Sequence, residues 1–161
     1  MAKLSDLLAR LEEFEGKLAL LYDCYAGRFT HTPEVAELFA KLGFEENSHR
    51  DIVRYEGRVV INDPEHFGEI EANIRLIDEQ LARVDAAIET RYQATVEEAV
   101  GFTLAIERSA LEGLYVSIPA SLDPAFGRIV TAMKAGCTDH VAAVTGIIRR
   151  HGLNIRIPKA A

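Results

Sequence analysis

Two ionisable side chains interrupt an apolar helical stripe in the first third of the chain. Glu46 and His49 stand three residues apart, a spacing that places both on one face of an α-helix. The other positions of that face, at steps of three and four residues, are Val35, Phe39, Leu42 and Val53. Such a stripe is buried in a folded protein, and a buried carboxylate is unfavourable unless it is compensated. The fold must therefore supply a partner for Glu46.

The same pattern of a polar residue within an apolar stripe recurs in three further segments. Glu15, Glu107 and His140 each lie within a stripe whose members are three or four residues apart. Such stripes predict helices that pack side by side in a bundle. We expect these helices at about residues 5–29, 33–57, 95–119 and 123–151.

Capping residues support these boundaries. Ser5 is the expected N-cap of the first helix, Thr32-Pro33 opens the second, and the capping box Thr95-Val96-Glu97-Glu98 opens the third. Asp123-Pro124 opens the fourth helix. That helix should stop at His151-Gly152, because glycine commonly follows a helix end.

The segment 58–94 separates the two pairs of helices. Residues 58–64 include three consecutive β-branched residues and are predicted to be extended. Residues 64–90 carry an apolar stripe without a polar member, which predicts a further amphipathic helix. This helix fits either a crossover between the two pairs or half of a dimer interface.

The two helix pairs follow one plan. The spacing from Pro33 to His49 equals the spacing from Pro124 to His140, and Cys137 takes the place of the glutamate that precedes the first histidine. We therefore predict one all-α domain over residues 1–161. It is a four-helix bundle of two hairpins, about 5–57 and 95–151, with a long helical crossover, about 58–94, between the second and third helices.

The buried acids call for a positive charge that the stripes do not contain. In a bundle the carboxylates of Glu15, Glu46 and Glu107 would point inward together with the imidazoles of His49 and His140. Burying an unpaired ion costs several kcal/mol, so three would rival the ~5–15 kcal/mol net stability of a domain. Basic residues nearby fall outside the stripes, namely Lys17, Arg50, Arg108 and Lys134. A metal ion can supply the charge, because it accepts carboxylate oxygen and imidazole nitrogen together.

Composition narrows the classes of partner. The net charge of -7 disfavours nucleic acid and anionic membrane surfaces. Charges interrupt every apolar run before the ~20 residues of a membrane span, and the first residues lack a signal-peptide core, so we expect a cytoplasmic protein. Two cysteines, Cys24 and Cys137, are too few for a disulfide scaffold or a four-cysteine metal site.

The chain resembles the ferritin-like superfamily, and within it the rubrerythrin-type di-iron domains, over about residues 8–148. The residues that carry the resemblance are Phe14-Glu15, Leu21-Tyr22, Glu45-Glu46-Asn47-Ser48-His49, Ala105-Ile106-Glu107 and His140. It implies a ferritin-like bundle with a di-iron centre. Glu15 and Glu107 would be terminal ligands, Glu46 a bridging carboxylate, and His49 and His140 one imidazole for each metal.

The same resemblance implies an oxidoreductase that acts on peroxide, O₂ or ferrous iron, as a rubrerythrin-like peroxidase or a ferroxidase. Rubrerythrins also carry a cysteine-rich, rubredoxin-like module for electron entry, and two cysteines cannot form one. Electrons would come from an external donor or from substrate iron. We further expect a homodimer.

Cys137 departs from the family pattern, which has a second bridging glutamate at this place. A thiolate is softer than a carboxylate and does not bridge two irons in the same geometry. Cys137 is thus a candidate metal ligand or a small apolar filler. Three outcomes stay open: a di-metal site with one carboxylate bridge, a single metal ion on Glu15, Glu46 and His49, or a site that has lost its metal. Manganese stays open as an alternative to iron.

Two alternatives to an enzyme follow from the same residues. The buried glutamates could be ordinary core residues, hydrogen-bonded to Tyr22, Tyr25 or a histidine. Separately, the protein could be a metal-binding or storage protein without turnover, or a non-catalytic ferritin-like dimer with a degenerate site. Cys137 favours both alternatives over the enzyme.

Overall fold

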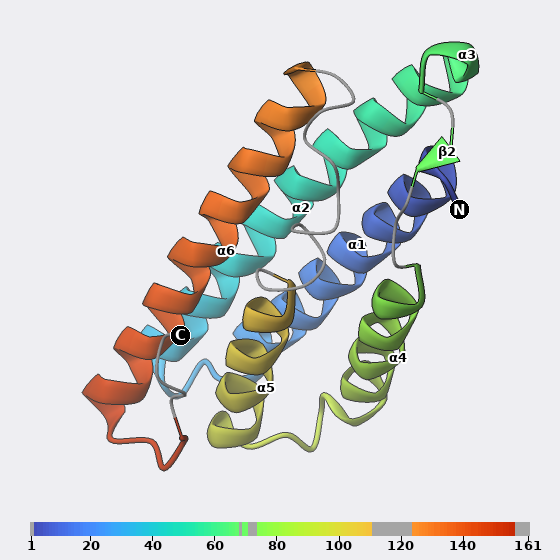
Figure 1. Ribbon diagram of the computed structural model, residues 1–161. Helices are drawn as coiled ribbons and strands as arrows, with labels where there is room; N and C mark the ends of the chain where they lie inside the picture. Colours follow the sequence, from blue (N-terminus) through green and yellow to red (C-terminus); the bar gives the residue numbers. More distant parts are fainter. Residues whose placement is uncertain (1, 68, 71–73, 111–123, 157–161) are drawn as a thin grey trace.

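The computed structural model describes residues 2–67, 69–70, 74–110 and 124–156, and this part of the chain is helical (Figure 1). The helices are α1 (Leu4–Arg28), α2 (Pro33–Asn62), α3 (Pro64–Phe67), α4 (Ile74–Thr90), α5 (Val96–Ser109) and α6 (Pro124–His151). Two short strands, β1 (Ala2–Lys3) and β2 (Glu69–Ile70), pair antiparallel. The predicted all-α class is confirmed for the described residues. None of the described helices is both long and apolar enough to cross a membrane.

The long hairpin of α1 and α2 is the centre of the packing. The two helices run antiparallel beside each other (Figure 1). α6 lies beside α2, α5 packs on α6, and α4 packs against α1. One apolar core joins side chains from all five of these helices. This arrangement turns the interrupted stripes of α1, α2, α5 and α6 toward one another.

Four aromatic side chains pack together near the turn that joins α1 and α2. The ring centroid of Phe39 on α2 lies 5.0 Å from that of Tyr25 and 5.9 Å from that of Tyr22, both on α1. It also lies 5.9 Å from that of Phe29, the C-cap residue of α1. All four residues are at most 2% exposed. Aromatic pairs at these distances stabilise a core beyond the area that they bury. The cluster therefore fixes α1 relative to α2 and sets the register of their two stripes.

α2 is longer than the sequence predicts. The expected end near residue 57 and the extended connector over 58–64 are both wrong, because the helix continues to Asn62. Val60 is only 4% exposed, so its burial on the helix outweighs the β propensity of this segment. The helix ends before Pro64, as expected from the clash between a proline ring and a preceding helical residue.

The helix ends confirm part of the predicted capping. The capping box is present, with Glu98 N donating to Thr95 Oγ1 at 3.2 Å and Thr95 N donating to Glu98 Oε2 at 2.8 Å. Gly152 has φ of 61° and follows the end of α6. Pro33 occupies the first turn of α2 as predicted.

Other predicted helix ends differ or fall outside the described residues. Ser5 is not the N-cap, because α1 begins at Leu4 and Lys3 takes the capping position without a side-chain hydrogen bond. Lys3 lies instead in the short ribbon opposite Glu69. The predicted end of the third helix near residue 119 and the predicted cap at residue 123 lie outside the described part of the chain.

The predicted amphipathic helix over 64–90 is divided into α3, β2 and α4. Ile77, Leu81 and Val84 of α4 are buried, at 0–8% exposure, on the side that meets α1. Lys17 of α1 donates to Asp85 of α4 at 2.9 Å across the same contact. The apolar stripe of α4 therefore belongs to the core of this chain.

Candidate metal centre

Five of the predicted ligands meet in the interior, where four helices face one another. Glu15 lies on α1, Glu46 and His49 on α2, Glu107 on α5, and His140 on α6. Four of them are 1–2% exposed, and the side chain of His49 is 14% exposed. Helical periodicity alone thus identified residues that the fold brings together.

The five residues form two groups that share Glu46. The His49 group contains Glu15, Glu46 and His49, and the His140 group contains Glu46, Glu107 and His140. Within each group the candidate ligand atoms lie within 4.8 Å of one another. Glu46 Oε2 is 2.9 Å from His49 Nδ1, whereas Glu46 Oε1 is 3.0 Å from His140 Nδ1. One carboxylate therefore presents one oxygen to each histidine, as a bridging ligand does.

The other two carboxylates flank this shared one. Glu15 Oε2 lies 3.9 Å from His49 Nδ1, and Glu107 Oε2 lies 3.2 Å from His140 Nδ1. The two imidazole rings are tilted by 36° with centroids 5.8 Å apart. Each Nδ1 thus faces the shared carboxylate and one carboxylate of its own group.

His140 carries a proton in the metal-free protein. Burial lowers the pKa of its imidazole, but hydrogen bonds with Glu107 and Glu46 outweigh burial and raise the pKa to about 11. The ring is therefore cationic at neutral pH. It supplies part of the positive charge that the sequence stripes lack.

Glu45 holds the outer nitrogen of His140 and was not predicted as a site residue. Glu45 Oε2 lies 2.9 Å from His140 Nε2, and the Glu45 side chain is 35% exposed. A carboxylate on the second nitrogen of a ligand histidine fixes its tautomer and orientation. The paired acids Glu45-Glu46 were the only sequence signal for this contact, since Glu45 lies beside the apolar stripe.

Tyr22 holds Glu107 from the opposite side. Its hydroxyl donates to Glu107 Oε1 at 2.7 Å, and the ring is fully buried. Burial and the negative charges of Glu107 and Glu46 raise the pKa of Tyr22 well above 10.0, so the phenol stays a donor. A hydrogen bond between a buried glutamate and Tyr22 was one of the arrangements that the sequence left open, and it is present here.

Cys137 lies at the edge of the cluster and belongs to neither group. Its side chain is buried near the carboxylates of the cluster. Burial and the charges of Glu107, Glu15 and Glu46 raise the pKa of the Cys137 thiol far above its usual range. Cys137 is therefore a neutral thiol in the metal-free protein. Its predicted role as a ligand stays a prediction.

The donor set of the two groups fits a pair of metal ions. Lys17 is paired with Asp85 and Glu13, and Arg50 with Asp51, so neither balances the buried acids. Burial and the charge of Glu107 raise the pKa of Glu46. Protons thus stabilise the metal-free cluster, and a cation bound by carboxylate oxygen and imidazole nitrogen can replace them.

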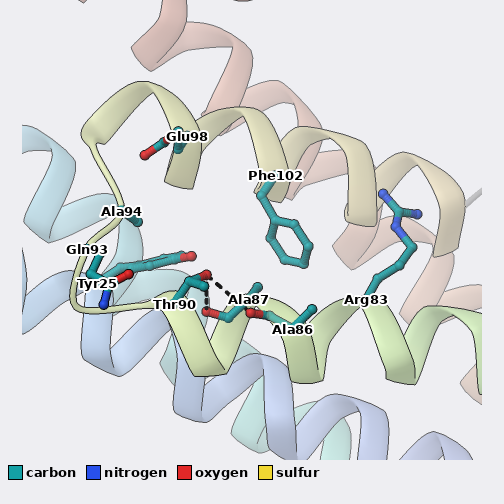
Figure 2. Close-up of a pocket in the computed structure, with 9 residues that line it drawn as sticks. All are labelled: Tyr25, Arg83, Ala86, Ala87, Thr90, Gln93, Ala94, Glu98 and Phe102. Atoms are coloured by element: carbon teal, nitrogen blue, oxygen red, sulfur yellow. Dashed lines mark hydrogen bonds between the residues drawn. The ribbon is translucent and has the colours of Figure 1, made fainter.

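A separate groove lies on another part of the molecule. A groove of about 630 Å³ runs between α4 and α5. Ala86 and Ala87 line it from α4 and Phe102 from α5, with Arg83 and Glu98 toward its two ends (Figure 2). None of the six predicted ligands lines this groove. The buried cluster and the open groove are separate features.

Across the described residues, fold and site define a mainly helical protein with a buried carboxylate–histidine cluster that could hold metal. Comparison with family models, curated proteins and solved structures finds no match. The ferritin-like family therefore stays a prediction from the motif residues of the sequence.

Proposed function

We propose that the protein is a ferritin-like di-metal protein that binds two iron ions in the buried cluster. The observation that carries the proposal is the placement of Glu46, whose two oxygens face two different histidines at 2.9 and 3.0 Å. The proposal includes a four-helix bundle of α1, α2, α5 and α6, with the segment between α2 and α5 as its crossover.

Each group would hold one ion. Glu15 and His49 would bind the first ion, Glu107 and His140 the second, and Glu46 both. A bound iron pair supplies electron transfer to O₂ or peroxide. The chain supplies carboxylates that neutralise the ions and an interior that excludes water. It also orients two ligands, because Tyr22 donates a hydrogen bond to Glu107 and Glu45 accepts one from His140.

The activity proposed for this site is that of an oxidoreductase on peroxide, O₂ or ferrous iron. An external electron donor and a homodimer are part of the same proposal. The buried position of four of the ligands supports it, because a dry site protects reactive iron from bulk solvent.

The test is metal loading of the purified protein. After anaerobic incubation with ferrous iron and desalting, we expect about two ions per chain by elemental analysis. His49→Ala and His140→Ala should each reduce this to about one ion, because each variant removes the imidazole of a single group. Failure of the wild-type protein to retain metal would overturn the proposal.

Metal binding without turnover is the second candidate function, and Cys137 favours it. A neutral thiol stands where the ferritin-like pattern has a second bridging carboxylate. Fewer bridges hold two ions less rigidly, which suits uptake or storage better than redox cycling. Consumption of peroxide or O₂ by the iron-loaded protein, supplied with a chemical reductant, separates the candidates. Sustained consumption supports the oxidoreductase, and iron retention without consumption supports storage.

A further inference from the structure

Gly136 occupies the interior of α6, where glycine is an unfavourable choice. Glycine weakens a helix relative to alanine, because its backbone loses more freedom on folding. Gly136 also has a counterpart in the duplicated plan: it stands four residues before His140, as Glu45 stands four residues before His49. Positions 45 and 136 can therefore be compared directly.

The two counterparts lie against the outer nitrogen of the opposite histidine. Glu45 on α2 contacts Nε2 of His140 on α6 at 2.9 Å. A Cβ atom added to Gly136 on α6 would lie 2.8 Å from Nε2 of His49 on α2 and 2.7 Å from its Cε1. Position 45 thus contacts His140 through a carboxylate. Position 136 has no side chain, so the α6 backbone itself lies next to His49.

The His49 ring has neighbours at Nδ1 and at one face. Its Nδ1 is 2.9 Å from Glu46 Oε2, and the His140 ring lies 5.8 Å away. Carbon atoms pack best at about 3.5–4.0 Å, so a methyl group at position 136 would push the His49 ring by roughly 1 Å. Such a displacement changes the distance and direction from His49 Nδ1 to the carboxylates of Glu46 and Glu15.

The close contact at Gly136 is not a general property of helical glycines in this chain. An added Cβ would meet nothing within 4 Å at Gly27, and its nearest neighbour would be 4.0 Å away at Gly57 and 3.9 Å away at Gly101. Gly43 is also tight, but there the nearest atom belongs to the exposed carboxylate of Asp23. Of the glycines compared, Gly136 alone faces a candidate metal ligand.

We propose that Gly136 is a positioning residue for the His49 group. Without a side chain at this position, the backbone of α6 comes close enough to hold the His49 ring with Nδ1 toward Glu46 and Glu15. Glu45 performs the same task for His140 through a hydrogen bond. The effect of Gly136 on metal binding rests on the proposed function. The contact between Gly136 and the His49 ring rests on the metal-free structure alone.

The geometric part is tested without metal, by NMR of the imidazole resonances in the metal-free protein. Gly136→Ala should shift the resonances of His49 and change its Nδ1 environment, because the ring must move. Gly27→Ala is the matched control, since it adds the same methyl group to a helical glycine with open space around it. Equal His49 spectra in wild type and Gly136→Ala would overturn the inference, whatever the protein does with metal.

The functional part is tested by metal titration of the same two variants. Gly136→Ala should weaken the His49 group by roughly 10–100-fold, the range seen for residues that orient a ligand, and change the His140 group far less. Gly27→Ala should bind as the wild type does. Equal affinities in wild type and Gly136→Ala would overturn the inference while leaving the metal centre in place.

A double variant separates positioning from a general effect on α6. In a His49→Ala background the imidazole is gone, so Gly136→Ala should cause no further loss of affinity. The double variant also relieves the contact, so it should fold even if Gly136→Ala alone does not. An equal loss in both backgrounds would show that Gly136 acts through the helix and not through His49. Absence of metal from the wild-type protein would overturn the proposed function alone, because the NMR comparison is independent of it.

Discussion

The His49 group and the His140 group follow one sequence plan but are held in different ways. His140 is 1% exposed, and its two nitrogens contact three carboxylates within 3.2 Å. The side chain of His49 is 14% exposed, with Nδ1 facing carboxylates and Nε2 against the backbone of Gly136. Carboxylates therefore hold both nitrogens of His140, whereas in the described contacts of His49 they hold Nδ1 and Nε2 faces position 136.

The difference arises from two adjacent positions. Glu45-Glu46 on α2 correspond to Gly136-Cys137 on α6, so only the first helix offers carboxylates there. A repeated helical plan therefore does not guarantee two equal half-sites. We expect the His140 group to bind metal more tightly, because a ligand that is already oriented loses less freedom on binding.

Removing the shared ligand should weaken metal binding in both groups. Glu46→Gln takes one anionic ligand from both groups, so we expect affinity to fall by at least about 100-fold at each. Elemental analysis after iron loading measures this loss. Glu97→Gln, which changes an exposed acid on α5, is the control and should load normally. Two ions per chain in Glu46→Gln would show that Glu46 is not the bridge.

Removing the hydrogen bond to His140 should make the two groups more alike. Glu45→Gln replaces a charged acceptor on Nε2 with a neutral one, which lowers the basicity of the ring. We expect the His140 group to weaken by roughly 10–100-fold and the His49 group to change far less. Titration in the His49→Ala background isolates the affected group, with Glu37→Gln on the exposed face of α2 as control. An unchanged titration would mean that Glu45 does not orient the ligand.

Restoring the missing carboxylate should strengthen both groups. Cys137→Glu places a second acid beside Glu107, where the ferritin-like pattern has a bridge, and we expect affinity to rise about tenfold, or ~1.4 kcal/mol. Competition with a chelator measures the gain. Cys137→Ser, which adds a hydroxyl but no charge, should not reproduce it. Weaker binding by Cys137→Glu than by the wild type would indicate that the thiol itself is a ligand.

The metal-free protein should lose stability as pH rises. The pKa of His140 is raised from 6.5 to about 11, so the stability that its proton contributes is fully present below pH 6.5. That contribution declines as pH increases, by at most about 1.4 kcal/mol per pH unit, and is lost above the folded-state pKa. Urea unfolding between pH 7 and 9 measures the slope. It should vanish in His140→Ala and persist in His49→Ala, and a slope that survives His140→Ala belongs to another group.

Helical periodicity predicted the buried residues of the site, because the pattern of each stripe can be read from one helix without knowing how the helices pack. Glu15, Glu46, Glu107 and His140 interrupt apolar stripes, and any packing that buries those stripes brings them together. Periodicity did not predict Glu45 or Gly136. Both act across the α2–α6 contact, and that contact depends on the distance and rotation between helices.

The errors in the fold prediction have a similar cause. The β-branched run at 59–61 was read as extended from intrinsic preference, yet packing of α2 keeps it helical to Asn62. The division of 64–90 into α3, β2 and α4 depends on the pairing of Glu69 with Lys3, a residue far away in the chain. Local preference cannot anticipate contacts of that range.

The shared carboxylate of Glu46 also has a thermodynamic consequence. Under the proposed function, the first ion would fix the orientation of the Glu46 side chain, and the second would then meet a ligand that is already ordered. Occupation of either group would therefore raise the affinity of the other by the same factor, because coupling between two sites is reciprocal. The His140 group, expected to bind more tightly, would load first, and its ion would order the carboxylate that the second ion meets in the His49 group.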